Sequence, residues 1–330
     1  MLSLFIFATE LKLCGVCRQS FLIIILIFIA LSGYGQDPMF SQFYANKLYL
    51  NPAFAGTANC PRVSLNYRNQ WPGIDNSFVT YTASYDQQVD AINGGLGVLI
   101  MRDQAGEGVL SSTSAHFQYS YQFSVNRKFS IRSGFQASFV QKSIDVSNLR
   151  FGDMIDSRRG FVYQSQEQIN NDRVLYPDFS AGILGFSEKL YFGFAVHHLT
   201  APDEGFIDLS VLPRRFTGHF GAKLPFGLKN EDMSWSPNVI YQQQGEFTEL
   251  NLGVYVSKGP IVLGLWHRLA DSFIALVGIE KDDFKIGYSY DLTTSVLSDR
   301  TAGSHEISFS YILPCRPKKV KFETISCPSF

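Results

Sequence analysis

Residues 284–291 read Phe-Lys-Ile-Gly-Tyr-Ser-Tyr-Asp, so that apolar side chains alternate with polar or small ones. Successive side chains of a β-strand point to opposite faces of the sheet, and this stretch therefore predicts a strand with one apolar face. The same period of two recurs upstream, for example in residues 117–123, which read Phe-Gln-Tyr-Ser-Tyr-Gln-Phe. No comparable stretch of helical period follows Gln36. The sequence therefore predicts an all-β chain.

Fourteen segments with this alternation can be placed, near residues 62–71, 77–86, 94–104, 110–124, 129–142, 178–186, 189–199, 214–224, 233–244, 247–257, 260–268, 272–280, 283–292 and 303–313. The long connections, at about 143–177, 200–213 and 293–302, each join an odd-numbered segment to the next even-numbered one. Long loops at one end and short turns at the other are typical of outer-membrane β-barrels. We therefore predict a transmembrane antiparallel barrel of about 14 strands over residues 62–313.

The alternative fold is a secreted β-sandwich or a soluble barrel, whose strands also alternate. Fourteen meandering strands with loop lengths segregated by side favour the membrane barrel, in which the apolar and aromatic faces would contact lipid. Residues 261–266 are apolar on both faces. We expect this strand to pack on an internal plug or on a partner.

The composition excludes several classes of protein. Of the 330 residues, 45% are hydrophobic, 15% aromatic and only 17% charged, and the formal net charge is -1. Disordered chains combine low hydrophobicity with high net charge, so this chain is expected to fold. A basic excess, which would be needed to hold nucleic acid by counterion release, is absent. We expect no nucleic-acid partner.

The first 35 residues read as a secretory signal peptide. Lys12 and Arg18 precede an unbroken apolar run over 21–31, and small residues then lead to an expected cleavage after Gly35. The run is shorter than the roughly 20 residues that a helix needs to span a bilayer, although a membrane anchor is the alternative reading. We expect export across the inner membrane of a Gram-negative bacterium and residence in the outer membrane.

The mature N-terminus, residues 36–61, predicts an ordered segment ahead of the first strand. Asp37-Pro38 and Asn51-Pro52 read as turn starts, because the Asx side chain bonds its own backbone and proline fixes φ. Gly56 permits a positive φ. Aromatic residues in between need burial. The segment is expected to be a plug or docking segment at the periplasmic mouth of the barrel, with packing inside the barrel for stability alone as the alternative.

Five blocks of sequence are distinctive. They are Gln36-Asp37-Pro38-Met39-Phe40-Ser41-Gln42-Phe43-Tyr44-Ala45-Asn46, Leu50-Asn51-Pro52-Ala53-Phe54-Ala55-Gly56, Tyr67-Arg68-Asn69-Gln70-Trp71, Asp103-Gln104-Ala105-Gly106 and Gly303-Ser304-His305-Glu306-Ile307-Ser308. With these blocks the chain resembles the PorP/SprF family of type IX secretion system outer-membrane proteins from Bacteroidetes. The resemblance covers nearly the whole mature chain, and the Asn-Pro-Ala-Phe-Ala-Gly block is its most specific part.

The resemblance implies a non-catalytic component of the protein secretion and gliding machinery. Its partners would be outer-membrane lipid together with the periplasmic secretion ring or the C-terminal domain of a large secreted adhesin, and no small-molecule substrate is expected. The alternative function is a passive or ligand-specific channel. The candidate docking residues are Asp37, Pro38, Phe40, Gln42, Asn51, Pro52, Phe54 and Gly56, joined by Arg158 and Arg159 from the longest connection.

Three cysteines follow the expected cleavage site, in an oxidising compartment that permits disulfides. Cys60 lies just before the first strand and Cys315 just after the last, and closure of the barrel would make those strands neighbours. A Cys60–Cys315 disulfide is predicted, with Cys315–Cys327 and free thiols as the alternatives. The tail, residues 314–330, contains a basic run and is expected in the periplasm.

Motifs for catalysis or cofactor binding are absent from the sequence. It contains no Gly-x-Ser-x-Gly, no His-Glu-x-x-His and no paired-cysteine zinc spacing. His197 and His198 are adjacent, so in a strand they would point to opposite faces and could not share a metal ion. We therefore expect neither enzymatic activity nor a cofactor or metal ion.

Overall fold

The computed structural model describes residues 36–315, except for 59, 75–76, 127, 150, 157, 164, 166–171, 227–232 and 295–300. The expected signal peptide (1–35) and the part of the expected periplasmic tail that follows Cys315 lie outside the described residues. Among the described residues, no helix has both the length and the apolar character needed to cross a membrane.

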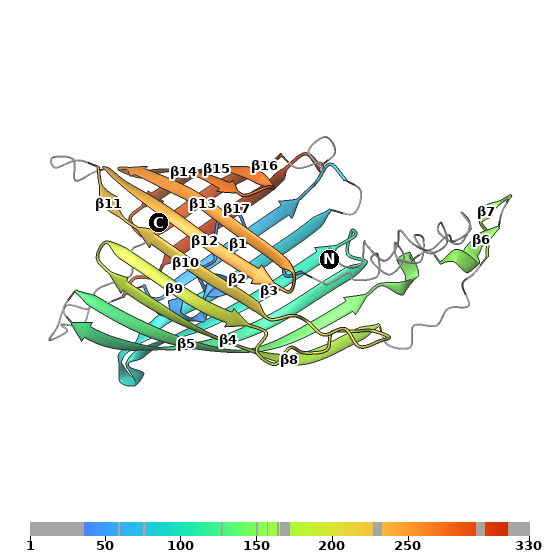
Figure 1. Ribbon diagram of the computed structural model, residues 1–330, viewed down its shortest axis with the longest axis horizontal. Helices are drawn as coiled ribbons and strands as arrows, with labels where there is room; N and C mark the ends of the chain where they lie inside the picture. The colour runs from blue at the N-terminus through green and yellow to red at the C-terminus, as the bar shows by residue number, and fades with distance from the viewer. Residues whose placement is uncertain are drawn as a thin grey trace, which may run out of the picture. The chain divides into compact units, whose positions relative to one another are not determined.

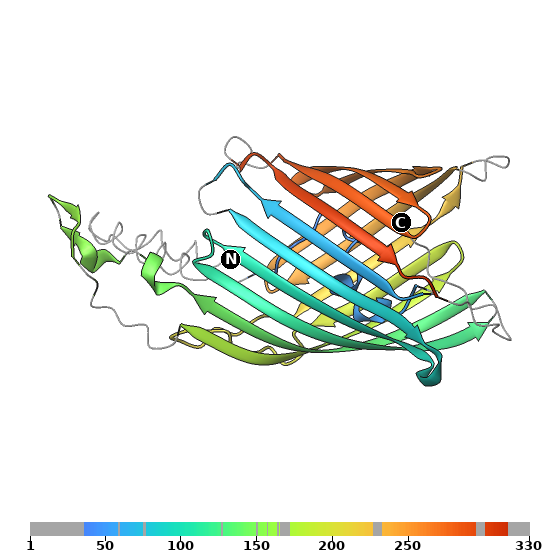
Figure 2. The same cartoon turned by 180° about the vertical axis from the view of Figure 1, so that it is seen from behind.

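Fourteen long antiparallel strands of the described chain close into a barrel (Figures 1 and 2), which confirms the predicted fold class and strand number. They are β1 (Arg62–Gln70), β2 (Phe78–Val89), β3 (Gly94–Ala105), β4 (Leu110–Asn126), β5 (Phe129–Ile144), β8 (Arg173–Ser187), β9 (Leu190–His197), β10 (Arg215–Ala222), β12 (Met233–Gln244), β13 (Phe247–Lys258), β14 (Ile261–Arg268), β15 (Ser272–Lys281), β16 (Phe284–Thr293) and β17 (Ser304–Ile312).

The barrel is closed by the first and last strands. β1 pairs with β17 in an unbroken register from Arg62 opposite Ile312 to Gln70 opposite Ser304. On the other side, β10 pairs with β12, and the short β11 (Leu224–Pro225) adds to β12. A sandwich would leave free edges, whereas closure lets each barrel strand pair on both sides.

The two ends of the barrel differ. Connections 145–172, 198–214 and 294–303 lie at one end, here called the long-loop end. At the opposite end, called the short-turn end, β1 begins and β17 ends. The 145–172 connection contains two 3-10 helices, η3 (Val146–Asn148) and η4 (Gly152–Met154), and a small separate sheet of β6 (Ile155–Asp156) and β7 (Gly160–Phe161). Another 3-10 helix, η2 (Asp90–Ile92), lies in the turn between β2 and β3.

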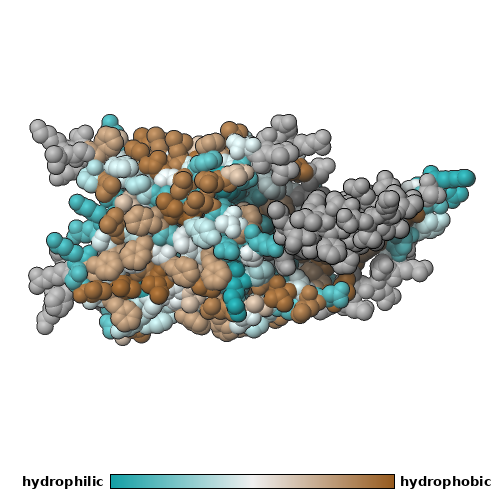
Figure 3. Space-filling view, viewed as in Figure 1, coloured by the Kyte–Doolittle hydropathy of each residue, from teal (hydrophilic) through white to brown (hydrophobic). Residues whose placement is uncertain are grey.

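Alternation along each strand separates an apolar exterior from a largely polar interior. On β4, Phe117 and Tyr119 are exposed outward, while Gln118 and Ser120 are buried inward. Figure 3 shows apolar side chains spread over the strands on the face in view. The period of two seen in the sequence is therefore the alternation between the outside and the inside of the barrel.

The chain's own N-terminus lies inside the barrel. Residues 38–57, here called the plug segment, run inside the barrel and contain the short helix α3 (Lys47–Leu50) and the 3-10 helix η1 (Pro52–Phe54) (Figures 1 and 2). Its aromatic and aliphatic side chains form a buried cluster with inward-facing residues of the wall, among them Leu184, Tyr191, Ile240, Trp266 and Ile274. The core thus lies between the plug segment and the wall.

Candidate functional site: the plug segment inside the barrel

The conformation of the plug segment follows from its turn residues. The Asn51 side-chain oxygen accepts a hydrogen bond from the Ala53 N–H at 2.9 Å and so caps η1, while Pro52 occupies a first-turn position of that 3-10 helix. Gly56 has φ 67°, a left-handed value that glycine adopts without strain, and its N–H donates to Asp86 Oδ2 of β2 at 2.8 Å. The predicted turn chemistry therefore fixes both the shape of the segment and its attachment to the wall.

Asn51 also joins the plug segment to the opposite wall. It is fully buried, and its Nδ2 donates to the Ile183 carbonyl of β8 at 3.1 Å. The same amide lies 3.3 Å from His219 Nε2 of β10, and the ring of Phe54 stacks on the His219 imidazole with centroids 5.2 Å apart. Asn51 Nδ2 also donates to the Phe194 carbonyl of β9 at 3.4 Å, so this one side chain contacts its own turn and three strands of the wall.

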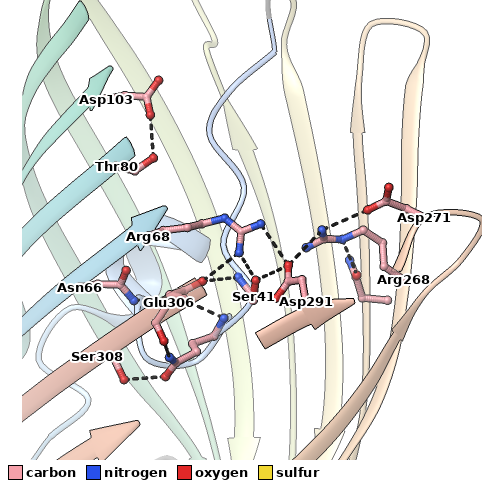
Figure 4. A network of polar contacts seen from close by, with 12 residues as sticks. Ser41, Asn66, Arg68, Thr80, Asp103, Arg268, Asp271, Asp291, Glu306 and Ser308 are labelled. Carbon is pink, nitrogen blue, oxygen red and sulfur yellow. Dashed lines mark hydrogen bonds and ion pairs between the residues drawn. The ribbon is translucent and has the colours of Figure 1, made fainter. Parts of the chain in front are cut away.

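A network of charged groups holds the start of the plug segment (Figure 4). The backbone N–H groups of Ser41 and Gln42 donate to the two carboxylate oxygens of Glu306, on β17, at 2.6 and 3.2 Å. Arg68 of β1 forms ion pairs with Glu306 at 3.3 Å and with Asp291 of β16 at 3.1 Å, and it also bonds Ser41 Oγ. All five residues are buried. Three blocks of sequence that lie far apart in the chain therefore meet at one point.

The network continues along the wall to β14. Arg268 lies 3.6 Å from Asp291 and 3.1 Å from Glu249 of β13. Its guanidinium also reaches the partly exposed Asp271 at 3.3 Å, in the loop that follows β14. Arg68 and Arg268 therefore share Asp291, and the pairing offsets the cost of burying these charges.

Backbone carbonyls of the plug segment accept hydrogen bonds from polar side chains of the wall. The Ala55 carbonyl accepts hydrogen bonds from Arg132 Nη1 and from Ser120 Oγ, both at 2.7 Å. The Leu48 carbonyl accepts a hydrogen bond from Gln118 Nε2 at 2.9 Å. Irregular backbone buried in a barrel needs such partners, because water does not reach it freely. The inward polar residues of β4 and β5 are therefore matched to the plug segment.

Glycines on the inner wall make room for the segment. A Cβ at Gly134 of β5 would overlap the Ala53 backbone, and one at Gly95 of β3 would overlap Ala55. A Cβ at Gly287 of β16 would come within 2.5 Å of Gln42 Oε1. The wall is therefore shaped to the path of the plug segment as well as chemically matched to it.

Aromatic packing completes the fit on the other half of the wall. Phe43 packs against Trp266 of β14, with ring centroids 4.9 Å apart, and Tyr44 meets Tyr191 of β9 edge to face at 5.6 Å. β14 contains residues 261–266, which the sequence showed to be apolar on both faces, and its inward-facing apolar residues are Val262 and Trp266. Of the two expectations for this strand, an internal plug or a partner, the structure shows contact with the plug segment.

The structure gathers most of the predicted docking residues in one place. The buried side chains of the plug segment include Phe40, Gln42, Asn51, Pro52 and Phe54, and Gly56 is buried with them, while Pro38 is half-buried at its start. Asp37, which is half-buried, immediately precedes the segment.

Arg158 and Arg159 are separate from this group. They form the turn between β6 and β7, in a sheet that is not part of the barrel sheet. Their backbone N–H groups each donate to Asp156 Oδ1 at 2.9 Å, and these two bonds lower the pKa of the Asp156 carboxyl. The structure therefore divides the predicted docking residues between the plug segment and a surface turn.

A disulfide joins Cys60 to Cys315, with Cα atoms 5.6 Å apart. It links the residues that flank the closing pair of strands, at the short-turn end. Cys327, the rival partner of Cys315, lies outside the described residues.

The charged network was missed in the prediction of docking residues from the sequence. Arg68, Asp291 and Glu306 occupy the inward positions of otherwise ordinary alternating strands. A signal was present, because a charged residue at an inward position of a barrel strand needs a buried partner. The sequence alone gave no means of choosing that partner.

Near the short-turn end a cavity of about 310 Å³ lies between the plug segment and the wall. Its lining includes Lys47, Thr57, Cys60, Arg62 and Lys285. Among the described residues, no group of three or more His, Cys, Asp or Glu side chains could hold a metal ion. His197 bonds the Leu50 carbonyl and His198 bonds Asp178, so these adjacent histidines have separate partners.

A closed barrel with an apolar exterior, whose polar interior is filled by its own N-terminal segment, defines an integral outer-membrane β-barrel protein. The chain belongs to the PorP/SprF family of type IX secretion system membrane proteins, because a model of this family matches residues 32–311. The protein is therefore an outer-membrane component associated with that secretion system.

Several solved structures are similar to this chain at low sequence identity. No curated protein sequence matches the chain. Similar solved structures include the CymD monoaromatic hydrocarbon channel (9% identity, 82% of this chain and 93% of that chain, TM-score 0.47). A Pseudomonas aeruginosa FadL homologue is 12% identical over 85% of this chain and all of its own, with TM-score 0.44. Omp33 of Acinetobacter baumannii is 7% identical over 78% of this chain and all of its own, also with TM-score 0.44.

Proposed function

We propose that this protein is a non-catalytic outer-membrane docking component of the type IX machinery, which engages either the periplasmic secretion ring or the C-terminal domain of a secreted adhesin. The observation that carries the proposal is the plug segment. A pathway for solutes needs free space along the barrel axis, whereas this interior is occupied by a segment that Arg68, Glu306, Arg132 and Asn51 hold in place.

The two candidate partners correspond to two ends of the molecule. A ring protein would approach the short-turn end, where Lys47 and Thr57 of the plug segment line the cavity together with Arg62. An exported protein would approach the long-loop end, where Arg158 and Arg159 present their side chains on the β6–β7 turn. Cationic side chains in an exposed turn favour an acidic partner surface.

The test is a mild-detergent pull-down from outer membranes of the native host, with an affinity tag inserted in the 316–330 tail and bound proteins identified by mass spectrometry. Recovery of one large secreted protein or of the periplasmic ring proteins is expected. Recovery of general porins alone, repeated after chemical crosslinking, would overturn the proposal.

A matched pair of variants assigns the end that is used. The Arg158→Glu, Arg159→Glu double variant is expected to lose a secreted partner, because it reverses the charge of the β6–β7 turn. Lys189→Glu is the control, since Lys189 is also exposed, in the turn between β8 and β9 at the short-turn end. Equal recovery from all three proteins would exclude the turn as the contact.

Reconstitution in planar bilayers tests the alternative function. The docking proposal predicts no steady ion conductance from the intact protein, because the plug segment fills the lumen. A stable conductance from the intact protein, together with a pull-down that recovers no secretion component, would establish the channel instead.

A further inference from the structure

One barrel strand has an edge that its neighbour does not cover. β8 pairs with β5 along residues 173–187, but its pairing with β9 covers only Ala181 to Phe186. β9 ends at His197, and His198, with φ 57°, turns the chain away from the sheet. The last backbone bond on this side runs from the Leu199 N–H to the Phe179 carbonyl at 2.9 Å. Within the described part of the chain, residues 173–177 at the long-loop end are therefore paired on one side only.

The register shows which backbone groups point to the open side. In an antiparallel ladder, alternate residues direct both their N–H and their C=O to the same neighbouring strand. The Asp172 carbonyl bonds the Ile144 N–H beside β5, whereas the Phe179 carbonyl bonds toward β9. Odd-numbered residues of β8 therefore face the open side. Arg173 and Leu175 each direct an N–H and a C=O there, and Pro177 directs a C=O only.

Among the described residues, these groups have no backbone partner. The 198–214 connection lies to the inner side instead, where Glu204 forms an ion pair at 2.9 Å with Lys142, an inward-facing residue of β5. Thr200 and His198 likewise bond the inward-facing Asp178. The connection that follows β9 thus contacts the lumen side of β5 and β8. None of the contacts described for it involves the backbone of residues 173–177.

The open edge lies above the lipid-facing part of the wall. Free backbone groups do not occur in contact with hydrocarbon, so the edge must lie in water or in the headgroup region. The outward side chains of Gln141 and Ser143 of β5 and of Arg173 of β8 are polar, and Leu175 is the apolar exception among them. The exposed, apolar Phe139 is level with Pro177, at the lower end of the edge. Five residues at about 3.4 Å each give an edge about 17 Å long.

We propose that this edge, Arg173–Pro177, is a strand-addition site for an extended segment of the exported protein that the machinery serves. The proposal rests on the function proposed above and adds the place and mode of contact. Alternate N–H and C=O groups along an edge are matched by the backbone of another extended chain, which then adds one strand to the sheet. Leu175, 70% exposed and pointing outward from the middle of the edge, would pack against a side chain of the added strand.

Pro177 disfavours a pairing of two copies of this chain that is centred on Leu175. In a symmetric pairing centred on Leu175, Arg173 of each copy would face Pro177 of the other. Proline has no N–H, so both Arg173 carbonyls would be left without a donor. A different chain that offers a donor opposite Arg173, and needs none from Pro177, satisfies the edge completely.

The first experiment places a photo-crosslinking amino acid, p-benzoylphenylalanine, at position 175 in the native host and identifies the crosslinked peptide by mass spectrometry. We expect crosslinks to a segment of the same secreted protein that the pull-down recovers. The control position is Phe117, which is exposed on the outer face of β4 and should give no protein crosslink. Crosslinks to residues 198–214 or to a second copy would overturn the proposal.

The second experiment separates backbone from side-chain recognition. Leu175→Pro deletes the edge N–H, and Leu175→Ala keeps it while removing most of the side chain. We expect recovery of the secreted protein to fall about tenfold or more for Leu175→Pro and much less for Leu175→Ala, because an acceptor left without its donor is costly. Resistance of the folded barrel to SDS at room temperature checks that both variants fold.

Failure of this inference can be distinguished from failure of the proposed function. If the pull-down recovers the secreted protein while position 175 gives no crosslink and Leu175→Pro binds normally, the docking function stands and the edge is not its site. If the pull-down recovers ring proteins alone, the edge proposal is again wrong. If the pull-down recovers no secretion component, both the docking function and the edge proposal are wrong.

Discussion

Glu306 shows how much one buried carboxylate can organise in this barrel. It accepts the backbone N–H groups of Ser41 and Gln42, an amide hydrogen from Asn66 at 2.7 Å and the guanidinium of Arg68. Each of these groups lacks access to bulk water, so each depends on the others for a hydrogen-bonding partner. At the residue scale, the plug segment is therefore held by charge-assisted hydrogen bonds that few substitutions can replace.

Substitution of Arg68 tests this network. Arg68→Ala leaves Asp291 and Glu306 without that guanidinium, and we expect the free energy of unfolding in detergent to fall by about 3–5 kcal/mol, because breaking a buried ion pair strands its charge. Urea titration followed by tryptophan fluorescence measures the change. Arg102→Ala is the control, since Arg102 is exposed on β3, and its effect should stay within about 0.5 kcal/mol. Equal effects of the two substitutions would contradict a structural role of the network.

At the scale of elements, the plug segment and the wall form one fitted unit. The segment has little regular structure, only α3 and η1, and its backbone groups depend on side chains of β2, β4, β5 and β17 for partners. Glycines of the wall have no Cβ, and this allows the backbone of the segment to pack closely against them. The segment can therefore keep its path only as long as the wall keeps its shape.

A pair of glycine substitutions tests the fit. Gly134→Ala places a methyl group against the Ala53 backbone and should displace the plug segment, whereas Gly218→Ala on β10 meets no atom within 4 Å and should leave it in place. We expect faster cleavage of residues 38–57 by added protease, and new ion conductance in bilayers, for Gly134→Ala only. Unchanged protease resistance in Gly134→Ala would show that the wall can yield, and that the close approach does not hold the segment.

At the scale of the whole molecule, closure is achieved between the two ends of the barrel sequence. The ladder from Arg62 to Gln70 joins strands whose partners are more than 230 residues apart, and the Cys60–Cys315 disulfide spans a sequence separation of 255. A covalent link across so long a loop restricts the unfolded chain strongly, by the loop-entropy argument. The disulfide is therefore placed where it favours the closed barrel most.

Alkylation followed by mass spectrometry tests the pairing in the exported protein. Without reduction, we expect alkylation of Cys327 alone among the three cysteines of the mature chain, and a linked peptide pair that contains Cys60 and Cys315. After denaturation and reduction all three should react. Alkylation of all three without reduction, or a linked Cys315–Cys327 pair, would contradict the pairing.

The sequence by itself determined the number of strands and the two ends of the barrel, because alternation and turn chemistry are local properties of consecutive residues. It placed the start of one strand wrongly, since β8 begins at Arg173 and not near residue 178. It also indicated an ordered N-terminal segment through Asn51-Pro52 and Gly56. Only the tertiary structure decided that this segment lies inside the barrel, that Ser41, Arg68 and Glu306 meet, and that β9 leaves part of β8 uncovered. These contacts join residues up to 265 positions apart. Barrel closure selects such partners from many chemically equivalent ones, and a local pattern holds no information on that choice.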